Sequence, residues 1–427
     1  MTSLLQIDDR ITDTWRAPTR VRVALAGCGA VGSALVRELA ACRETLAERH
    51  GVEVVLTRVL VRDLTLERAA PLDRSLLTAD VDDFLAADAD VVVEAIGGLD
   101  PARRIAWSTL SRGRELVTAN KELLAECGTE LSALAARADT ALRYDAAVGG
   151  GVPVLRLLDD ALGAGTPSRV RGILNGTSNF VLTQLEDGAT LDAALRSARA
   201  AGFAEADASR DLDGRDAAAK IALVAWAAFG IAPEGVRVRR VSVLPDPSRY
   251  VRLGERLDRV ARQVAECALV EGAVAASVEP VLVGRDSALA RTRDEQNRVE
   301  VHTGWSAPLC ASGPGAGGCP TATALLSDVL APRRRERRVR AVTSAPRDDR
   351  RFDWVVEVRG APGVLHRLVP ACGFVQTDAT ASCAWTFVHG ASAHEIDAVL
   401  FALRAEEVDP IAVRCDPLEH ASAVVIS

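Results

Sequence analysis

The segment Gly202 to Lys220 concentrates the side chains best suited to acid–base chemistry. It reads G-F-A-E-A-D-A-S-R-D-L-D-G-R-D-A-A-A-K, with carboxylates at Glu205, Asp207, Asp211, Asp213 and Asp216. From about Asp213 onward the pattern is helical, and its spacing places Asp213, Asp216 and Lys220 on one face. Such an Asp–Lys pair is commonly a solvated ion pair on a helix surface. Among so many carboxylates, however, the lysine is also a candidate proton donor to a developing alkoxide.

A second lysine, Lys121, follows a strand predicted at Glu115 to Thr118, in the sequence T-A-N-K. The carboxyl ends of parallel strands border the ligand crevice of an open α/β sheet, so we expect Thr118 and Lys121 to face a bound ligand. An exposed lysine in a loop is the alternative. If both lysines converge on one substrate, we favour Lys220 as proton donor and Lys121 as its electrostatic partner, with the reverse order also open.

A cofactor site is predicted near the N-terminus. The apolar strand Val21 to Ala26 runs into G-C-G-A-V-G, and a helical pattern follows through Ala40. In G-x-G-x-x-G the first glycine permits a tight turn, the second admits a pyrophosphate, and the third lets helix and strand pack closely. The expected dinucleotide contacts are Gly27, Gly29, Ala30, Val31 and Gly32.

Two further strands complete the expected cofactor crevice. One, at about Val52 to Leu60, precedes Arg62 and Asp63. Arg62 favours the 2′-phosphate of NADP and Asp63 the free hydroxyl of NAD, so the choice of cofactor stays open. The other, Asp90 to Ile96, ends in Gly97 and Gly98, where the cofactor can approach the backbone.

Later motifs predict a second, substrate-binding part. Arg143 to Ala147 reads as a strand, and the glycines that follow it mark a junction between domains. After a strand at Arg169 to Leu174, the sequence N-G-T-S-N caps a helix predicted at Phe180 to Glu186 and can present N–H groups to a carboxylate. The glycine-rich segment Gly313 to Gly318 is a second anion cradle or a flexible lid.

The overall composition excludes several classes of protein. The chain has 427 residues and a net charge of −7, which argues against a general binder of nucleic acid or anionic membranes. There is no apolar run of membrane-spanning length, and Met1 to Arg20 lacks the apolar core of a secretion signal. Nine scattered cysteines without C-x-x-C pairs suggest reduced thiols, so we expect a cytoplasmic protein.

The expected fold is α/β, with a Rossmann-type dinucleotide-binding domain at 1–150, whose first strand begins near residue 21 and to which residues 310–330 return in part. An α+β domain for substrate binding and dimerisation follows at 151–310. An Arg-rich linker at 331–351 leads to 352–427, where the strand and helix order βαββαβ is ferredoxin-like.

These motifs, in their order and spacing from about Val21 to Leu330, resemble homoserine dehydrogenases. The motifs are G-C-G-A-V-G, T-A-N-K, A-V-G-G-G-V-P, G-I-L-N-G-T-S-N-F, F-A-E-A-D-A-S-R-D-L-D-G-R-D-A-A-A-K and G-P-G-A-G-G-C-P-T-A. The tail resembles the ACT-type regulatory domain often joined to that family. The resemblance implies interconversion of L-aspartate 4-semialdehyde and L-homoserine with NAD or NADP, in threonine, methionine and isoleucine biosynthesis.

The resemblance also implies roles for individual residues. Lys121 and Lys220 match the two active-site lysines, and Asp216 matches the acid that orients Lys220. Glu205 matches the carboxylate that receives the substrate amino group. Further substrate and cofactor positions that match are Asp211, Gly176, Thr177, Phe203 and Gly315. Asp145, Val148 and Gly150 fall where family members bind sodium.

Departures from the family pattern keep other readings open. Asp145 stands where Glu is usual, Phe203 stands where some members have Tyr, and a Lys that often follows the V-R-D segment is absent. A specialised paralogue acting on another small amino-aldehyde or amino-alcohol is therefore one alternative, and a non-catalytic NAD(P)-binding sensor is another. For the tail, the alternatives are an amino-acid effector site and an oligomerisation module, with a homodimer or tetramer expected.

Overall fold

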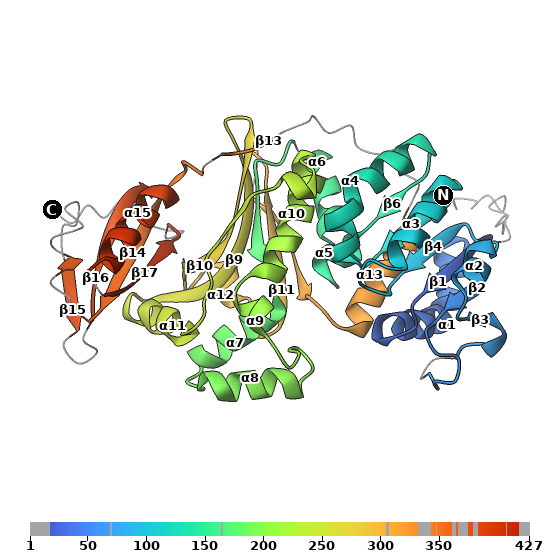
Figure 1. Cartoon of the computed structure of the whole chain (residues 1–427), viewed down its shortest axis with the longest axis horizontal. Helices are drawn as coiled ribbons and strands as arrows, with labels where there is room; N and C mark the ends of the chain where they lie inside the picture. Colours follow the sequence, from blue (N-terminus) through green and yellow to red (C-terminus); the bar gives the residue numbers. More distant parts are fainter. Residues whose placement is uncertain are drawn as a thin grey trace, which may run out of the picture.

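The computed structural model describes residues 18–68, 71–163, 165–304, 307–331, 343–346, 348–360, 364–365, 375–378, 383–406 and 408–417. Figure 1 shows three parts side by side along the long axis: an α/β part at one end, long central strands with helices against them, and a smaller part built around α15 (Ala393–Arg404). No helix within the described ranges has both the length and the apolarity that a membrane crossing requires.

The first part is an all-parallel sheet in the order β3-β2-β1-β4-β5-β6. Its strands are β1 (Thr19–Ala26), β2 (Val52–Leu60), β3 (Leu77–Thr78), β4 (Val91–Glu94), β5 (Glu115–Thr118) and β6 (Leu142–Arg143). Its helices are α1 (Ala30–His50), α2 (Val81–Ala86), α3 (Ala102–Ser111) and α4 (Lys121–Arg137). The strand order reverses between β1 and β4, and such a switch point opens a ligand crevice at the carboxyl ends of the strands.

Both faces of this sheet are buried, which explains the nearly continuous apolar strands. Val23 and Leu25 pack with α1 on one face, while Ala24 and Ala26 pack on the other with α3 and α4. The late helix α13 (Gly318–Leu330) also packs here, since Leu325 and its neighbours share the core of α1. A Cβ atom at Gly318 would lie 3.0 Å from the carbonyl oxygen of Ala30, so a glycine allows this close packing.

The central part is a mixed sheet in the order β12-β11-β7-β9-β10, which continues directly into the C-terminal strands. Its strands are β7 (Arg169–Ile173), β8 (Val238–Arg240), β9 (Arg259–Val270), β10 (Ala273–Gly284), β11 (Gln296–His302) and β12 (Leu309–Pro314). The helices are α5 (Asp145–Gly149), α6 (Val154–Gly163), α7 (Gly176–Glu186), α8 (Leu191–Ala200), α9 (Ser209–Leu212), α10 (Arg215–Phe229), α11 (Pro247–Arg256) and α12 (Ala288–Arg291). The apolar run of α10 forms much of the core against β9 and β10, and this anchors its first turn in place.

The C-terminal strands lie in the antiparallel order β17-β14-β16-β15. They are β14 (Arg351–Arg359), β15 (Val375–Asp378), β16 (Cys383–Ser392) and β17 (Asp409–Cys415), while β13 (Thr343–Ser344) pairs with β10. Numbered within the predicted βαββαβ unit, this is the order 4-1-3-2 that the ferredoxin-like connection produces. The helix predicted at Pro362 to Cys372 lies outside the described residues, except for a helical 364–365.

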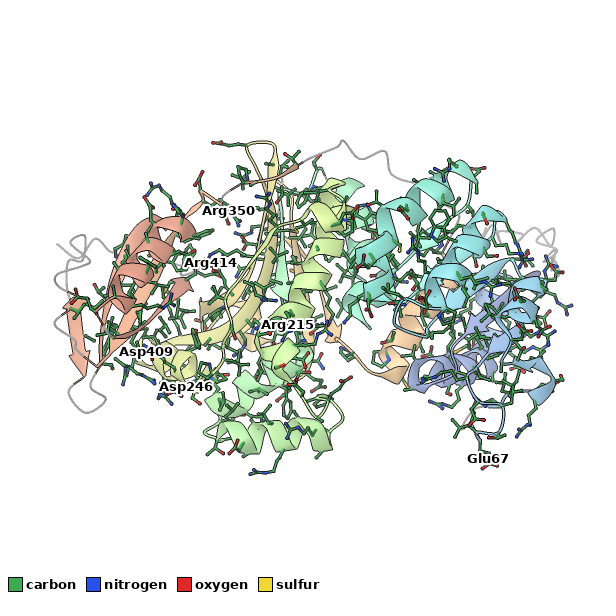
Figure 2. All side chains as sticks on the ribbon, viewed as in Figure 1. Glu67, Arg215, Asp246, Arg350, Asp409 and Arg414 are labelled. Atoms are coloured by element: carbon green, nitrogen blue, oxygen red, sulfur yellow. The ribbon has the colours of Figure 1, made fainter. Side chains whose placement is uncertain are left out.

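A buried ionic network joins the C-terminal part to the central sheet. Arg414 of β17 is fully buried and lies 3.3 Å from Glu266 of β9 and 3.1 Å from Glu279 of β10. Arg350 also pairs with Glu266, and Figure 2 shows Arg350 and Arg414 between the two parts. Burial alone would raise the pKa of Glu266, but the two arginines outweigh burial and hold this pKa well below its usual range. Removing one partner would leave an uncompensated buried charge, so the network ties the two parts together.

The structure corrects two predicted elements. The strand predicted at Arg143 to Ala147 is only the end of β6, and the chain turns at Tyr144 into the short helix α5. Ala146 and Val148 pack into two different hydrophobic cores on either side of the turn. A short apolar sequence buried in this way has the same pattern as a strand, so the pattern alone could not tell the two apart. The helix after the glycine loop runs to His50, beyond the predicted Ala40, and ends at Gly51 with φ 60°.

Candidate active site

A cavity of about 770 Å³ lies where the parallel sheet meets the central part. The carboxyl ends of β4 and β5 border one side, and α7, α9 and α10 border the other. The residues that line it include Gly97, Gly98, Asn120, Lys121, Asn175, Gly176, Thr177, Phe203, Glu205, Asp211, Asp216, Lys220 and Gly317. The structure therefore brings the two lysines and the acidic segment into one cavity, although Lys121 and Lys220 come from separate parts of the fold.

Asp216 lies between the two lysines. Its Oδ1 accepts a hydrogen bond from Lys121 Nζ, and its Oδ2 lies 2.8 Å from Lys220 Nζ. Lys220 also donates to the carbonyl oxygen of Leu174 at 2.8 Å. Asn120 caps α4 by accepting the N–H of Leu123 at 3.0 Å, and this fixes Lys121 at the first helical position. These are the only lysines in the 427-residue sequence, so both ammonium groups of the protein's lysine side chains meet at one carboxylate.

The surroundings shift the proton affinities of this cluster. Burial lowers the pKa of Lys220, and the negative charge of Asp216 opposes that effect. For Asp216 burial favours the protonated acid, yet the charges of Lys220 and Lys121 outweigh it and hold its pKa well below the usual range. A buried ammonium whose pKa falls toward neutrality is suited to donating and recovering a proton.

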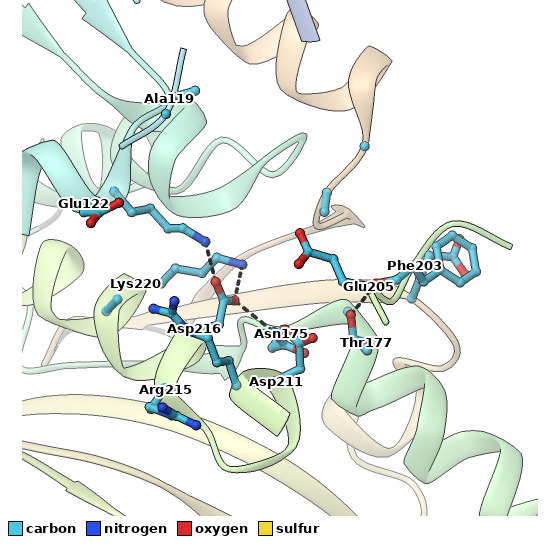
Figure 3. A pocket seen from close by; sticks show the side chains of 18 of the residues that line it. Ala119, Glu122, Asn175, Thr177, Phe203, Glu205, Asp211, Arg215, Asp216 and Lys220 are labelled. Carbon is cyan, nitrogen blue, oxygen red and sulfur yellow. Dashed lines mark hydrogen bonds and ion pairs between the residues drawn. The ribbon is translucent and has the colours of Figure 1, made fainter. Parts of the chain in front are cut away.

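The acidic segment folds differently from the prediction at one point. Asp213 is not part of the lysine-bearing helix: α9 ends at Leu212, Gly214 takes a left-handed conformation at φ 81°, and α10 begins at Arg215. The Asp213 side chain instead lies before the new helix and accepts the N–H of Arg215, the first residue of α10, at 2.9 Å. Only Asp216 and Lys220 share the predicted face, while Asp211 reaches the cavity from α9 (Figure 3).

The predicted substrate residues gather opposite this cluster. Figure 3 shows the Glu205 carboxylate facing Asp216 and Lys220 across the cavity. Thr177 Oγ1 donates to the carbonyl oxygen of Phe203 at 2.5 Å, and this holds the loop that carries Glu205. The Phe203 ring lies 5.3 Å from the ring of Phe180 between centroids, so it contributes an apolar wall without a hydroxyl. Helix α7 starts at Gly176, earlier than predicted, because Asn175 caps it.

A cofactor fits the crevice beside this cavity. A smaller cavity of about 310 Å³ adjoins it and is lined by Val31, Gly97, Lys121, Gly150, Lys220 and Gly315, among others. A Cβ at Gly29, Gly97 or Gly98 would enter open space, whereas one at Gly27 or Gly32 would meet backbone oxygens at 2.6 and 2.1 Å. The glycines thus keep the turn tight and the space above it clear, and α1 starts there with free N–H groups suited to a pyrophosphate. Gly27, Gly29, Ala30, Val31 and Gly32 all belong to this turn and helix start.

Thr118 and Arg62, which were also predicted to contact the cofactor, line neither cavity. Thr118 is fully buried, and its hydroxyl donates to Glu94 at 2.6 Å, so it supports the crevice from beneath. Arg62 is exposed beyond the end of β2, and no described residue forms a hydrogen bond or ion pair with it. The neighbouring Asp63 carboxylate accepts both the N–H and the hydroxyl of Thr65, at 2.7 and 2.6 Å.

The predicted sodium segment contains a buried carboxylate pair. Asp145 accepts the N–H of Leu155 through Oδ1, but its buried Oδ2 has no hydrogen-bond partner in the described part of the chain and lies 3.5 Å from Arg156 Nε. The backbone N–H of Asp145 donates to Asp328 at 3.0 Å. Burial and the charge of Asp145 raise the pKa of Asp328 to about 7. Within the described residues, no three His, Cys, Asp or Glu side chains form a metal cluster.

Three supporting residues were not predicted as site residues. Glu94 accepts the N–H of Ile96 at 2.9 Å, and Asn120 donates to the carbonyl oxygen of Gly98 at 2.7 Å, so together they shape the glycine turn after β4. Asn175 contacts both Asp211 and Asp216. The T-A-N-K and N-G-T-S-N motifs contained both asparagines, but the sequence explained N-G-T-S-N as a helix cap and gave Asn120 no role of its own.

The doubly wound sheet, the glycine turn at its switch point and the lysine–aspartate cluster beside it define an NAD(P)-dependent oxidoreductase. Comparison with known families places the chain further. Residues 27–145 match the profile described as "Homoserine dehydrogenase, NAD binding domain", and residues 153–330 match "Homoserine dehydrogenase". The chain belongs to the homoserine dehydrogenase family, an assignment that agrees with the resemblance in its motifs.

Individual relatives support the same assignment. The homoserine dehydrogenase of Mycobacterium tuberculosis is 38% identical over 317 residues, covering 73% of this chain and 71% of the relative. That of Bacillus subtilis is 34% identical over 315 residues, covering 73% and 72%. The crystal structure of a homoserine dehydrogenase from Thiobacillus denitrificans superposes with a TM-score of 0.83 at 28% identity, over 94% of this chain and 99% of that one. A hyperthermophilic archaeal homoserine dehydrogenase in complex with NADPH matches 73% of this chain and 97% of its own length, with a TM-score of 0.57 and 25% identity.

Proposed function

We propose that the protein interconverts L-aspartate 4-semialdehyde and L-homoserine, with Lys220 as the proton donor and Lys121 as its electrostatic partner. When bound, a reduced nicotinamide cofactor supplies the hydride that converts the aldehyde carbon to an alcohol. The aldehyde oxygen gains negative charge as this happens, and Lys220 Nζ gives it a proton, leaving a neutral amine. In the reverse direction the neutral Lys220 takes the hydroxyl proton.

Asp216, shared by both lysines, is the observation that most directly supports these roles. It orients both Nζ atoms toward one point and offsets only part of their positive charge, so the developing alkoxide finds two positive groups without solvent rearrangement. Glu205 and Asp211 supply the negative charge that an amino-acid substrate's ammonium group requires. Gly176 and Thr177 at the start of α7 offer N–H groups to the substrate carboxylate.

Turnover can be followed through the absorbance of the reduced cofactor with L-homoserine and NADP⁺ or NAD⁺. We expect reduction of the cofactor with L-homoserine and none with L-serine. The serine side chain is one carbon shorter, so its hydroxyl would not reach Lys220 while its ammonium group contacts Glu205. Equal or better turnover with another amino-alcohol would contradict the substrate assignment and favour a specialised paralogue.

We further propose that NADP is the preferred cofactor, because Arg62 has no hydrogen-bond or ion-pair partner among the described residues, while the Asp63 carboxylate is held in its own turn. Arg62→Ala should lower kcat/KM for NADP⁺ by about tenfold or more, the effect of losing one charged hydrogen bond. The value for NAD⁺ should stay within about threefold. Arg43→Ala is the matched control, because it also removes an exposed arginine from this domain. Arg43 pairs with Glu53 at the other end of β2, away from Arg62. Equal losses with both cofactors in Arg62→Ala would contradict the assignment.

A monovalent cation at Asp145 is a further proposal. The buried Oδ2 of Asp145 has no hydrogen-bond donor among the described residues, and the backbone carbonyls of Val148 and Gly150 are the ligands expected alongside it. Replacing Na⁺ by choline at equal ionic strength should lower the melting temperature by a few degrees, since a bound ion stabilises the folded state. Asp145→Asn should show no difference between the two salts. The same melting temperature of the unsubstituted protein in both salts would contradict a cation site.

For the C-terminal part we propose a regulatory, ACT-type role in a homo-oligomer of a cytoplasmic enzyme. Its 4-1-3-2 sheet and its ionic tie to β9 and β10 support communication with the catalytic part. Pathway amino acids such as L-threonine should then lower turnover when added during the assay, and light scattering should give a mass of two or four chains. Unchanged turnover would favour an oligomerisation module.

A further inference from the structure

Asn175 occupies a place that its helix-capping role does not explain. It is buried at the end of the β7-to-α7 connection, with an exposed fraction of 4%. Its Oδ1 accepts the N–H of Ser178 at 2.7 Å, which caps α7. Its Nδ2 points the other way, into the cavity, and donates to Asp211 Oδ1 at 2.7 Å and to Asp216 Oδ2 at 2.9 Å (Figure 3). One amide therefore caps a helix and joins two carboxylates.

These two carboxylates serve different partners. Asp216 forms ion pairs with both lysines, whereas Asp211 forms none with either lysine and accepts a hydrogen bond from Asn175. Without a fixed bridge, Asp211 could rotate toward the same ammonium groups and compete with Asp216 for them. The amide holds one oxygen of each carboxylate and leaves the other Asp211 oxygen for the cavity.

We propose that Asn175 is a positioning residue, which separates the acid that orients the proton-donating lysine from the acid available to the substrate's ammonium group. The idea rests on the proposed function for the substrate's chemistry, but the bridging geometry stands without it. The alternative is that Asn175 acts only as a helix cap, in which case the contacts to Asp211 and Asp216 have no consequence for turnover.

A change at Asn175 should reach the ionisation of Asp211. Burial raises the pKa of Asp211 and the Asn175 hydrogen bond opposes this rise, while Asp216 adds repulsion and the two lysines add attraction. The other charged groups that line the cavity are Glu122, Glu205, Asp207, Arg210, Arg215 and Glu295. Loss of the donor therefore raises the pKa of Asp211, so that at a given pH a larger fraction of it is protonated and unable to bind an ammonium group.

Asn175→Ser separates the two roles of the amide. Serine caps a helix about as well as asparagine, but its hydroxyl is too short to reach both carboxylates. In the reductive direction protonated Lys220 sets the alkaline limb of the pH profile, which leaves the acid limb to the carboxylates. We expect kcat/KM for the aldehyde to fall about tenfold, mostly through KM, and its acid limb to move up by about one pH unit. Asn175→Asp, which keeps the cap and adds a negative charge, should move the limb further.

Asn179→Ser is the matched control. Asn179 is a buried amide of the same helix that donates to backbone carbonyls, including that of Asp294 at 2.9 Å, and it forms no hydrogen bond with a carboxylate among the described residues. We expect Asn179→Ser to lower the melting temperature but to leave the acid limb of the pH profile unchanged. Asn175→Ser should instead keep the melting temperature and move the acid limb to higher pH. An Asn175→Ser enzyme with the acid limb and KM of the unsubstituted protein would overturn the positioning role.

A second measurement does not depend on turnover. In protein labelled with ¹³C at the aspartate carboxyl carbon, the Asp211 signal, assigned by its loss in Asp211→Asn, should titrate at higher pH in Asn175→Ser than in the unsubstituted protein. An unshifted titration would overturn the proposal even if the true substrate were not L-homoserine. A shifted titration in a protein without homoserine turnover would instead leave the positioning role intact and contradict the proposed function.

Discussion

Lys220→Met is expected to reduce turnover in both directions by about a thousandfold, the range lost when both a general acid and a charge stabiliser disappear. Methionine nearly matches the lysine stem in volume, and Lys220 is buried, so the core around α10 should stay filled. Asp216 would still have Lys121 as a partner, which avoids leaving a buried carboxylate unpaired. Binding of NADPH, followed by its fluorescence, should remain, because the glycine turn at Gly27 is untouched.

Two companion variants decide the role of each lysine. Lys220→Arg keeps the positive charge, but an arginine does not release a proton at working pH, so it should be nearly as inactive as Lys220→Met. Lys121→Met should cost less, because it removes only charge stabilisation. A larger loss in Lys121→Met than in Lys220→Met would reverse the assignment, and a Lys220→Met enzyme within tenfold of normal turnover would rule Lys220 out as the proton donor.

The cofactor cradle was predictable because its determinants are local. In the segment from Val21 to Gly32, the strand, the tight turn and the helix start follow one another within a single βα unit, and each glycine has a steric reason that the sequence alone supplies. The structure confirms the fold this implies, a doubly wound parallel sheet with its crevice at the carboxyl ends of β1 and β4.

The catalytic cluster depended on contacts that no local pattern contains. Lys121 and Asp216 are 95 positions apart, and only their motifs' resemblance to a known family placed them together in advance. The helical spacing gave a wrong prediction for Asp213, which was expected on the same helix as Lys220. It did not take account of Gly214, whose left-handed conformation separates the end of one helix from the start of the next. Asn175 was missed for a related reason: an asparagine before a helix has a sufficient local explanation as a cap, so its second function appears only when Asp211 and Asp216 fold around it.

Asp216→Asn should lower turnover by about a hundredfold or more and change the pH dependence in a defined direction. The negative charge of Asp216 raises the pKa of Lys220 against the lowering effect of burial, so removing that charge lowers this pKa further. Reduction of the aldehyde needs protonated Lys220, and its alkaline limb should therefore move to lower pH. Oxidation of the alcohol needs neutral Lys220, and its acid limb should move to lower pH as well.

The sequence offers a direct measurement of this shift. Because Lys121 and Lys220 are the only lysines, protein labelled with ¹³C at lysine Cε gives two side-chain signals, and Lys220→Met assigns them. The Lys220 signal should titrate at lower pH in Asp216→Asn than in the unsubstituted protein. Asp213→Asn is the matched control, since Asp213 pairs with Arg215 at 2.6 Å and has no described contact with either lysine. If the Lys220 signal titrates at the same pH in all three proteins, Asp216 does not set the proton affinity of the donor, and its role is limited to holding the two lysines in place.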